Sequence, residues 1–364
     1  MLFEDISFDQ KSVKEVLVDM KYISELMVDL SLHSLFFDDK KIAESVLELE
    51  ERMDDLEYDA IISTMLSARN YRDAELVAPV SKILGAIEDI SNGSGDIAKL
   101  VKNDVRVPED LRRKLSGSFN PVAVVDATDD MAGEWFVDFF GEDVEVLAVH
   151  RDGLWEVNKS FDTMDKGDRI IIKGPWNKLK DYRDDKVSFE EVGDDEYIDD
   201  VVSQILRMRE LSELSIDLSF NAVISGSEFI AKEVVDLEES IDCKLSNLLE
   251  TVLESSSEFD DPLILKGILN LGYAFEMITD ASLEISESVL KGFDVHPVFT
   301  EAVQDSGDYV VRKKVESADN LENIVNNPSK VKAVKKKSRE GFEWIVSPDE
   351  NLIVNRDDIL LIEN

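Results

Sequence analysis

The amino-acid sequence predicts an α+β fold in which two three-helix bundles alternate with two small α/β modules. Three observations favour this fold: acidic blocks alternate with nearly balanced ones, the acidic blocks repeat each other, and the spacing of apolar residues changes from block to block. The net charge is −12 over residues 1–105 and −13 over 201–294, but only −5 over 106–182 and −3 over 295–364. A chain of 364 residues is also too long for one ordinary core, so at least two domains are expected.

An internal duplication is the strongest of these observations. When the chain is shifted by 188 residues, 13 of the 31 residues in 24–54 are identical to their counterparts in 212–242. Chance does not keep one register over such a length, so we interpret the two halves as copies of one unit. Fused copies often stand for a symmetric pair, and we therefore expect a pseudo-dimer within the chain, with a further homodimer left open.

Both acidic blocks have the apolar spacing of amphipathic helices. Apolar residues recur at steps of three and four, as in Val13, Val16, Leu17 and Met20. Short polar breaks divide each block into three such stretches, which is typical of an antiparallel three-helix bundle. The expected helices span about 9–36, 39–68 and 73–102 in the first copy and 199–224, 227–256 and 261–290 in the second.

The balanced blocks contain short strand-like runs and one short helix each. A module of about 65 residues encloses little core by itself, so we expect each module to dock on another part of the chain. The expected strands are 122–125, 144–150, 154–157 and 169–173, with a helix over 131–140, and then 309–313, 331–335, 344–346 and 359–362, with a helix near 321–325. The expected segments are helical domain 1–104, module 105–182, acidic linker 183–199, helical domain 200–292 and module 293–364.

The composition excludes several classes of partner. A net charge of −40 argues against nucleic acid and against direct docking on anionic lipid. No apolar run approaches the length of a membrane-spanning helix, and the N-terminal residues do not resemble a signal peptide. The single cysteine, Cys243, forbids an internal disulfide and suits a reducing compartment. We expect a cytoplasmic protein, with a peripheral position at the inner face of the membrane as an alternative.

Carboxylates spaced four residues apart make the helices candidates for metal binding. Such pairs lie on one helix face about 5–6 Å apart, where the two charges repel each other unless a cation lies between them. Oxygen ligands suit Mg, Ca, Mn or Fe, and a solvated acidic face is the alternative. Each copy has one pair and a glutamate on its third helix: Glu50, Asp54 and Glu88, then Glu238, Asp242 and Glu276.

A second set of acidic residues lies within otherwise apolar helical stretches. Asp29 and Asp217 recur between the copies, together with Glu25 and Glu213. These residues are expected to form either an exposed stripe beside the core or, alternatively, an extra ligand or a polar contact between the bundles.

One basic cluster, formed by Lys335, Lys336 and Lys337, interrupts this acidic chain, and Arg151 lies at the corresponding place in the first copy. The cluster either balances the acidic blocks or binds an anion. Gly93-Ser94-Gly95 follows no expected strand, so we expect no NAD or ATP site.

The helical blocks resemble PhoU-like domains. Glu50 to Asp54 and Glu238 to Asp242 match a Glu-x-x-x-Asp signature, and residues 88–92 and 276–280 are similar to a second signature. The resemblance implies a carboxylate-bound divalent or iron-type metal and adds Asp280 to its ligands, whereas Asn92 replaces that aspartate in the first copy.

The α/β modules resemble TrkA-C (RCK-C) domains, which are recognised by strands closed by a Gly-Asp turn. Gly167-Asp168 fits this turn, and Asp357-Asp358 fits it imperfectly. This resemblance implies that Arg151 and the three lysines bind a small effector, such as a cyclic dinucleotide or another anion.

Taken together, the two resemblances imply a non-enzymatic cytoplasmic regulator of a membrane cation transporter or channel, above all for potassium. The alternatives are a regulator of phosphate or magnesium transport, or a metal-binding helical bundle with an enzymatic or storage role.

Overall fold

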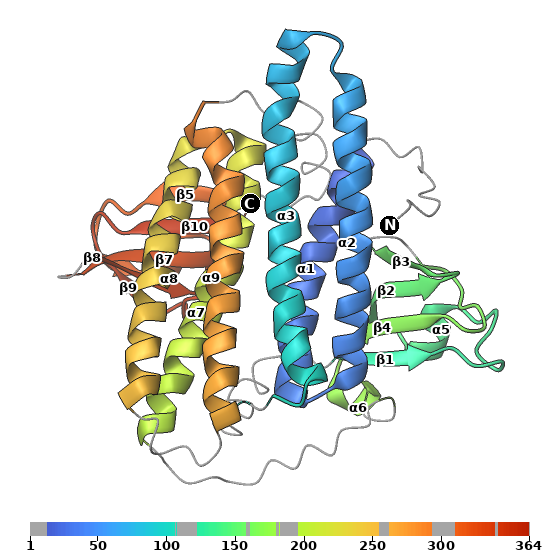
Figure 1. Ribbon diagram of the computed structural model, residues 1–364. Helices are drawn as coiled ribbons and strands as arrows, with labels where there is room; N and C mark the ends of the chain where they lie inside the picture. Colours follow the sequence, from blue (N-terminus) through green and yellow to red (C-terminus); the bar gives the residue numbers. More distant parts are fainter. Residues whose placement is uncertain are drawn as a thin grey trace.

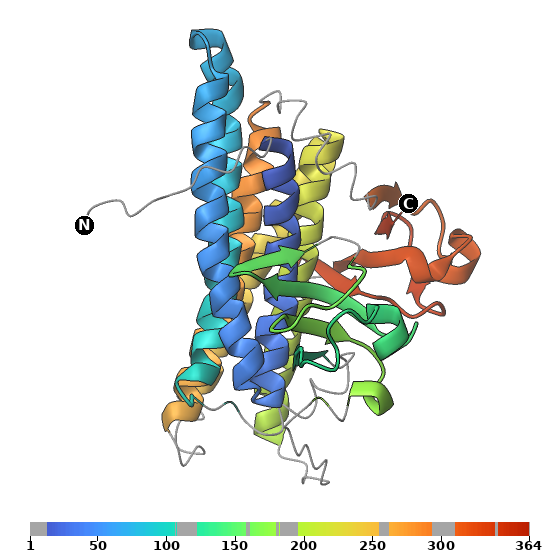
Figure 2. The same cartoon turned by 90° about the vertical axis from the view of Figure 1, so that its right-hand side faces the viewer.

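The fold was analysed in a computed structural model that describes residues 13–105, 107, 122–157, 161–179, 182, 196–254, 262–292, 310–338 and 341–363. Two three-helix bundles stand side by side, and each carries one four-stranded antiparallel sheet (Figure 1). Seen from the side, both sheets lie on the same side of the helical layer (Figure 2). The described residues therefore form an α+β fold, as expected. No described helix is long and apolar enough to cross a membrane.

The long helices confirm the expected bundles within a few residues at each end. Asp39 and Asn70 start the second and third helices by accepting hydrogen bonds from the first free backbone N–H groups. Within each bundle the three helices pack against one another. The first bundle comprises α1 (Val13–Phe37), α2 (Lys40–Ser67) and α3 (Tyr71–Lys102), and the second α7 (Glu196–Ser225), α8 (Glu228–Glu254) and α9 (Pro262–Leu290).

The two bundles meet where α3 packs against α9 at the centre of the molecule (Figure 1). Gly93 permits this close approach, because a Cβ atom there would lie 2.8 Å from Cγ1 of Ile278 and 3.3 Å from the carbonyl oxygen of Ala274. At the edge of the contact, Lys82 forms an ion pair with Glu287 at 2.7 Å. The Gly93-Ser94-Gly95 run therefore lies inside a helix, not in a phosphate-binding loop.

The two sheets have the same topology, with strand orders β1-β4-β2-β3 and β5-β10-β7-β8 and antiparallel pairing throughout. A bulge lies at the same place in each, at Leu147 and at Lys332. The first module contains β1 (Val122–Asp126), α5 (Phe136–Phe140), β2 (Glu145–Arg151), β3 (Leu154–Val157), β4 (Arg169–Lys173) and α6 (Trp176–Leu179). The second contains β5 (Val310–Lys314), β6 (Asp319–Asn320), α11 (Leu321–Ile324), a 3₁₀ turn (Pro328–Lys330), β7 (Val331–Ser338), β8 (Gly341–Val346), β9 (Ile353–Val354) and β10 (Ile359–Glu363).

Each sheet docks on its own bundle through equivalent contacts. The backbone N–H of Val122 donates to Nε2 of His33 at 3.0 Å, and that of Val310 donates to Oδ1 of Asn221 at 2.6 Å. Both donors and both acceptors are separated by 188 residues, so the duplication extends to the docking geometry. One face of each sheet joins the large core shared with the helices, as shown by buried Trp155. The expectation that each module docks on another part of the chain is thus confirmed.

Some expected boundaries differ from the structure. Of the expected linker 183–199, residues 183–195 lie outside the described residues, but 196–199 already belong to α7. The helix expected over 131–140 is shorter, since only Phe136–Phe140 is helical.

Candidate functional site

The carboxylates predicted to bind metal come together in the second bundle. Glu238 and Asp242 on α8 and Asp280 on α9 each offer an oxygen, and these oxygens all lie within 4.8 Å of one another. The helical spacing of four residues explains the first pair, and the antiparallel packing of α8 on α9 brings the third. Glu238 is half-buried, whereas the two aspartates are exposed, so an ion could enter from solvent.

The electrostatics of this cluster favour a cation. Burial raises the pKa of Glu238, and the charges of Asp242, Asp280 and Glu276 raise it further. Burial and the charge of Asp242 also raise the pKa of Glu276 and of Asp280. An all-oxygen donor set with excess negative charge therefore fits a hard divalent cation or iron.

The equivalent residues of the first bundle do not form such a donor set. The carboxylate of Glu50 accepts a hydrogen bond from the ammonium of Lys99 at 3.0 Å. Asn92 stands where the second copy has Asp280, and its amide donates to Glu88 at 2.7 Å. A lysine and an amide thus satisfy two of the three predicted ligands, which leaves Asp54 as the remaining carboxylate. The expectation of a metal at Glu50, Asp54 and Glu88 does not fit this geometry.

The predicted effector residues lie in different sheets and are largely engaged within the fold. Arg151 forms a 2.6 Å ion pair with buried Asp168, which closes the Gly-Asp turn. Although burial raises the pKa of Asp168, the hydrogen bond from Arg151 lowers it below its ordinary value. The side chain of Arg151 therefore stabilises the Gly-Asp turn. Whether it also binds an anion stays a prediction.

Lys335 is a buried link between the second sheet and its bundle. Its side chain is 4% exposed, and its ammonium pairs with Glu233 at 2.6 Å and also with Asp236. It is therefore not free to bind an anion, because moving it would leave Glu233 buried with fewer partners. Lys336 is half-buried and Lys337 is exposed, so an effector site there stays a prediction.

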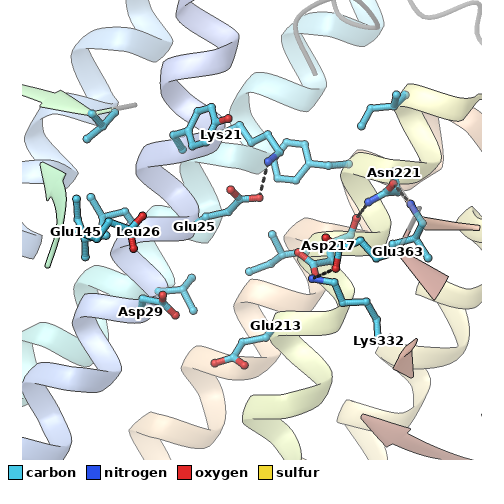
Figure 3. Close-up of a pocket in the computed structure, with 18 of the residues that line it drawn as sticks. Lys21, Glu25, Leu26, Asp29, Glu145, Glu213, Asp217, Asn221, Lys332 and Glu363 are labelled. Carbon is cyan, nitrogen blue, oxygen red and sulfur yellow. Dashed lines mark hydrogen bonds and ion pairs between the residues drawn. The ribbon is translucent and has the colours of Figure 1, made fainter. Parts of the chain in front are cut away.

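The structure also contains a cavity that the sequence did not predict. A cavity of about 740 Å³ lies where α1 and α7 face each other between the two sheets (Figure 3). The four acidic residues that recur within apolar stretches all line it: Glu25, Asp29, Glu213 and Asp217. They face the space between the bundles, where Asp29 is exposed and the other three are half-buried.

The cavity acids have equivalent partners in the two copies. Glu25 pairs with Lys21 at 2.8 Å, and Glu213 pairs with Arg209 at 2.7 Å, one helical turn earlier in each case. Each aspartate instead faces a lysine of its own sheet: Asp29 lies 3.8 Å from Lys173, and Asp217 lies 3.4 Å from Lys332. Burial raises the pKa of all four acids despite these cations.

Comparison with known proteins bears on the first bundle. A family model described as the PhoU domain matches residues 17–101, which run from α1 into the last turn of α3. The first bundle is PhoU-like. No curated protein matches this chain. The resemblance of the sheet modules to TrkA-C domains has no support from these comparisons and stays a prediction.

Two solved structures are similar to the chain at low identity. One is PhoU from Pseudomonas aeruginosa, at 14% identity and a TM-score of 0.44, covering 77% of this chain and 96% of that one. The other is the phosphate transport system regulatory protein PhoU from Streptococcus pneumoniae, at 10% identity and a TM-score of 0.46, covering 76% and 91%.

Proposed function

We propose that this chain is a cytoplasmic, non-enzymatic regulator of a membrane phosphate transporter. The observation that carries the proposal is the match of residues 17–101 to the PhoU domain, since proteins with this domain regulate phosphate transport. The same three-helix arrangement and the same docking contacts recur in the second half of the chain. The expectation of potassium transport depended on the resemblance of the sheet modules to TrkA-C domains, which the comparisons do not support, so phosphate takes precedence.

We further propose that the second bundle holds a divalent or iron-type metal. Glu238, Asp242 and Asp280 would supply the oxygen ligands, with Glu276 beside them. The bound ion would offset the repulsion among these carboxylates and tie α8 to α9. In a regulatory protein such a link stabilises one arrangement of the bundle.

Transport in cells that lack the gene tests the proposed function. Uptake of radiolabelled phosphate is measured beside uptake of ⁸⁶Rb⁺, which reports potassium transport, in the deletion strain and in the strain complemented with this chain. We expect phosphate uptake to change and to return on complementation, with ⁸⁶Rb⁺ uptake unaltered. A change confined to ⁸⁶Rb⁺ would refute the phosphate proposal and restore the potassium one.

A further inference from the structure

The turn that joins α2 to α3, with the helix ends beside it, exposes apolar side chains at one end of the molecule. We call residues 60–72 the hairpin end. Met65 and Leu66 in the last turn of α2 and Tyr71 at the start of α3 are 67%, 72% and 79% exposed. They are three of the four most exposed large apolar side chains in the described residues, and the fourth is Leu253. Single exposed apolar residues are common, but three of them around one turn indicate a surface that contacts something else.

The hairpin end also departs from the charge of the rest of the chain. It holds Arg69 and Arg72 and no acidic residue, although the whole chain has 80 acidic residues and a net charge of −40. Both arginines are exposed, and neither forms an ion pair with another described residue. The equivalent segment of the second copy, 248–260, has four acidic residues and no basic one. The positive charge thus distinguishes this end from its counterpart, and it favours an anionic partner.

The packing of the bundles makes the hairpin end project from the molecule. Because α3 and α9 run antiparallel with Lys82 beside Glu287, residues 71–78 of α3 extend beyond the end of α9 (Figure 1). At about 1.5 Å per residue this is a projection of about 12 Å, which exceeds the Debye length of about 8 Å at physiological salt. An anionic surface in contact with the hairpin end is therefore largely screened from the acidic helices behind it.

A small convex end suits a lipid surface better than a shaped protein site. A stable protein interface commonly covers about 800 Å² on each partner and involves about 20–30 residues a side, more than the hairpin end contains. A bilayer needs no complementary shape. Its boundary between headgroups and acyl chains accepts aliphatic side chains, its headgroup layer accepts tyrosine, and its anionic lipids attract arginine.

We propose that the hairpin end docks on an anionic lipid bilayer. Met65 and Leu66 enter the boundary between headgroups and acyl chains, and Tyr71 lies at the level of the headgroups. Arg69 and Arg72 lie beside the turn and contact the lipid phosphates. The proposal goes beyond phosphate transport and does not depend on it, because binding to vesicles is measured without a transporter.

Co-sedimentation of the full chain with lipid vesicles tests the proposal. Vesicles of phosphatidylcholine with about 30% phosphatidylglycerol are compared with pure phosphatidylcholine at about 150 mM salt. We expect binding to the anionic vesicles to be at least about tenfold tighter, and to weaken about tenfold in Met65→Ser/Leu66→Ser. The matched control, Phe229→Ser/Leu253→Ser, removes two side chains of similar exposure from α8, and its affinity should stay within about twofold of the unmodified chain.

Two further measurements locate the contact. Arg69→Gln/Arg72→Gln should also weaken binding to the anionic vesicles about tenfold, because it removes the attraction to phosphate. A polarity-sensitive fluorophore on Cys243→Ser/Leu66→Cys should shift its emission to shorter wavelength when anionic vesicles are added. The same fluorophore on the native Cys243, which is exposed on α8, should not shift.

Several results would overturn the proposal. They are equal binding to the two kinds of vesicle, equal weakening in the α8 control, and a fluorophore at residue 66 that anionic vesicles leave unchanged. No binding to anionic vesicles would also overturn it. If Met65→Ser/Leu66→Ser then still altered phosphate uptake in cells, the hairpin end would be assigned to contact with a protein.

Discussion

Neutralising Glu238 should change the stability of the chain in opposite directions with and without metal. In metal-free protein, Glu238→Gln removes repulsion between this carboxylate and Asp242 and Asp280, whose nearest oxygens lie within 4.8 Å. Unit charges at that separation repel by about 1 kcal/mol in water, so the variant should be about 1–2 kcal/mol more stable than the unmodified chain. In the presence of metal the order should reverse. An ion at 100 times its Kd adds about 2.7 kcal/mol to the unmodified chain, and the variant forgoes most of this.

The pH dependence of the metal-free protein follows from the same charges. Because burial and neighbouring carboxylates raise the pKa of Glu238, Glu276 and Asp280, the folded chain binds protons that the unfolded chain has already released. The free energy of unfolding should therefore fall as the pH rises above about 4, the ordinary carboxyl value, through these raised pKa values. Glu238→Gln should flatten this fall.

Urea unfolding in chelator and in a series of divalent cations measures both effects, and elemental analysis of protein purified without chelator identifies the ion. The matched control is Glu50→Gln at the equivalent position of the first copy. There the glutamate pairs with Lys99 at 3.0 Å, so its neutralisation should not stabilise the metal-free chain. If Glu238→Gln and Glu50→Gln shift stability alike in both conditions, the metal cluster is ruled out.

Substitutions at three further residues, two of them combined with a second change, test the packing of the fold. Lys335→Met should lower the opening free energy of the second sheet, measured by hydrogen exchange, by about 2–4 kcal/mol, because it leaves the buried Glu233 without this partner. The double variant Lys335→Met/Glu233→Gln should recover part of this loss, since residue 233 then carries no buried charge. Gly93→Val should lower the free energy of unfolding by about 1–3 kcal/mol because its side chain meets Ile278, and the smaller Ile278→Val in the same chain should relieve this loss. His33→Asn should unfold in urea within about 1 kcal/mol of the unmodified chain, whereas His33→Leu should lose about 1–3 kcal/mol, since only asparagine can still accept the backbone hydrogen bond.

The sequence was sufficient to predict the helices and most strands, because each carries its own periodic pattern. Helix ends were predictable where a capping side chain marks them, as at Asp39 and Asn70. The sequence analysis placed the start of α7 too late, because acidic residues are common both in linkers and in the first turns of helices. In the second module β6 and β9 pair with each other in a separate two-stranded sheet, which the sequence missed because each strand has only two residues and no detectable period.

The candidate sites were predictable only where the ligands lie on one helix or on helices of one bundle. Glu238 and Asp242 are one turn apart, so the sequence alone places them together. The cavity acids Glu25 and Glu213 depend instead on how two bundles and two sheets assemble, which no local pattern encodes. Their repetition within apolar stretches was the available signal. This repetition indicated that the four acids share a role, but not that they line a cavity.

The two copies differ at residues of the outer carboxylate clusters and of the sheets. On the outer face, Asn92 and Lys99 neutralise the first cluster, while the second keeps Asp280, so a metal has one favourable place and not two. At the cavity the copies differ at the bulge, where the second sheet carries Lys332 and the first carries Leu147, although Lys173 of the first sheet lies 3.8 Å from Asp29. A symmetric pair of identical chains cannot carry such complementary changes, since every substitution would appear twice. Fusion of the copies allows one carboxylate cluster to keep its third acidic residue, Asp280, while the equivalent cluster has Asn92 in that place.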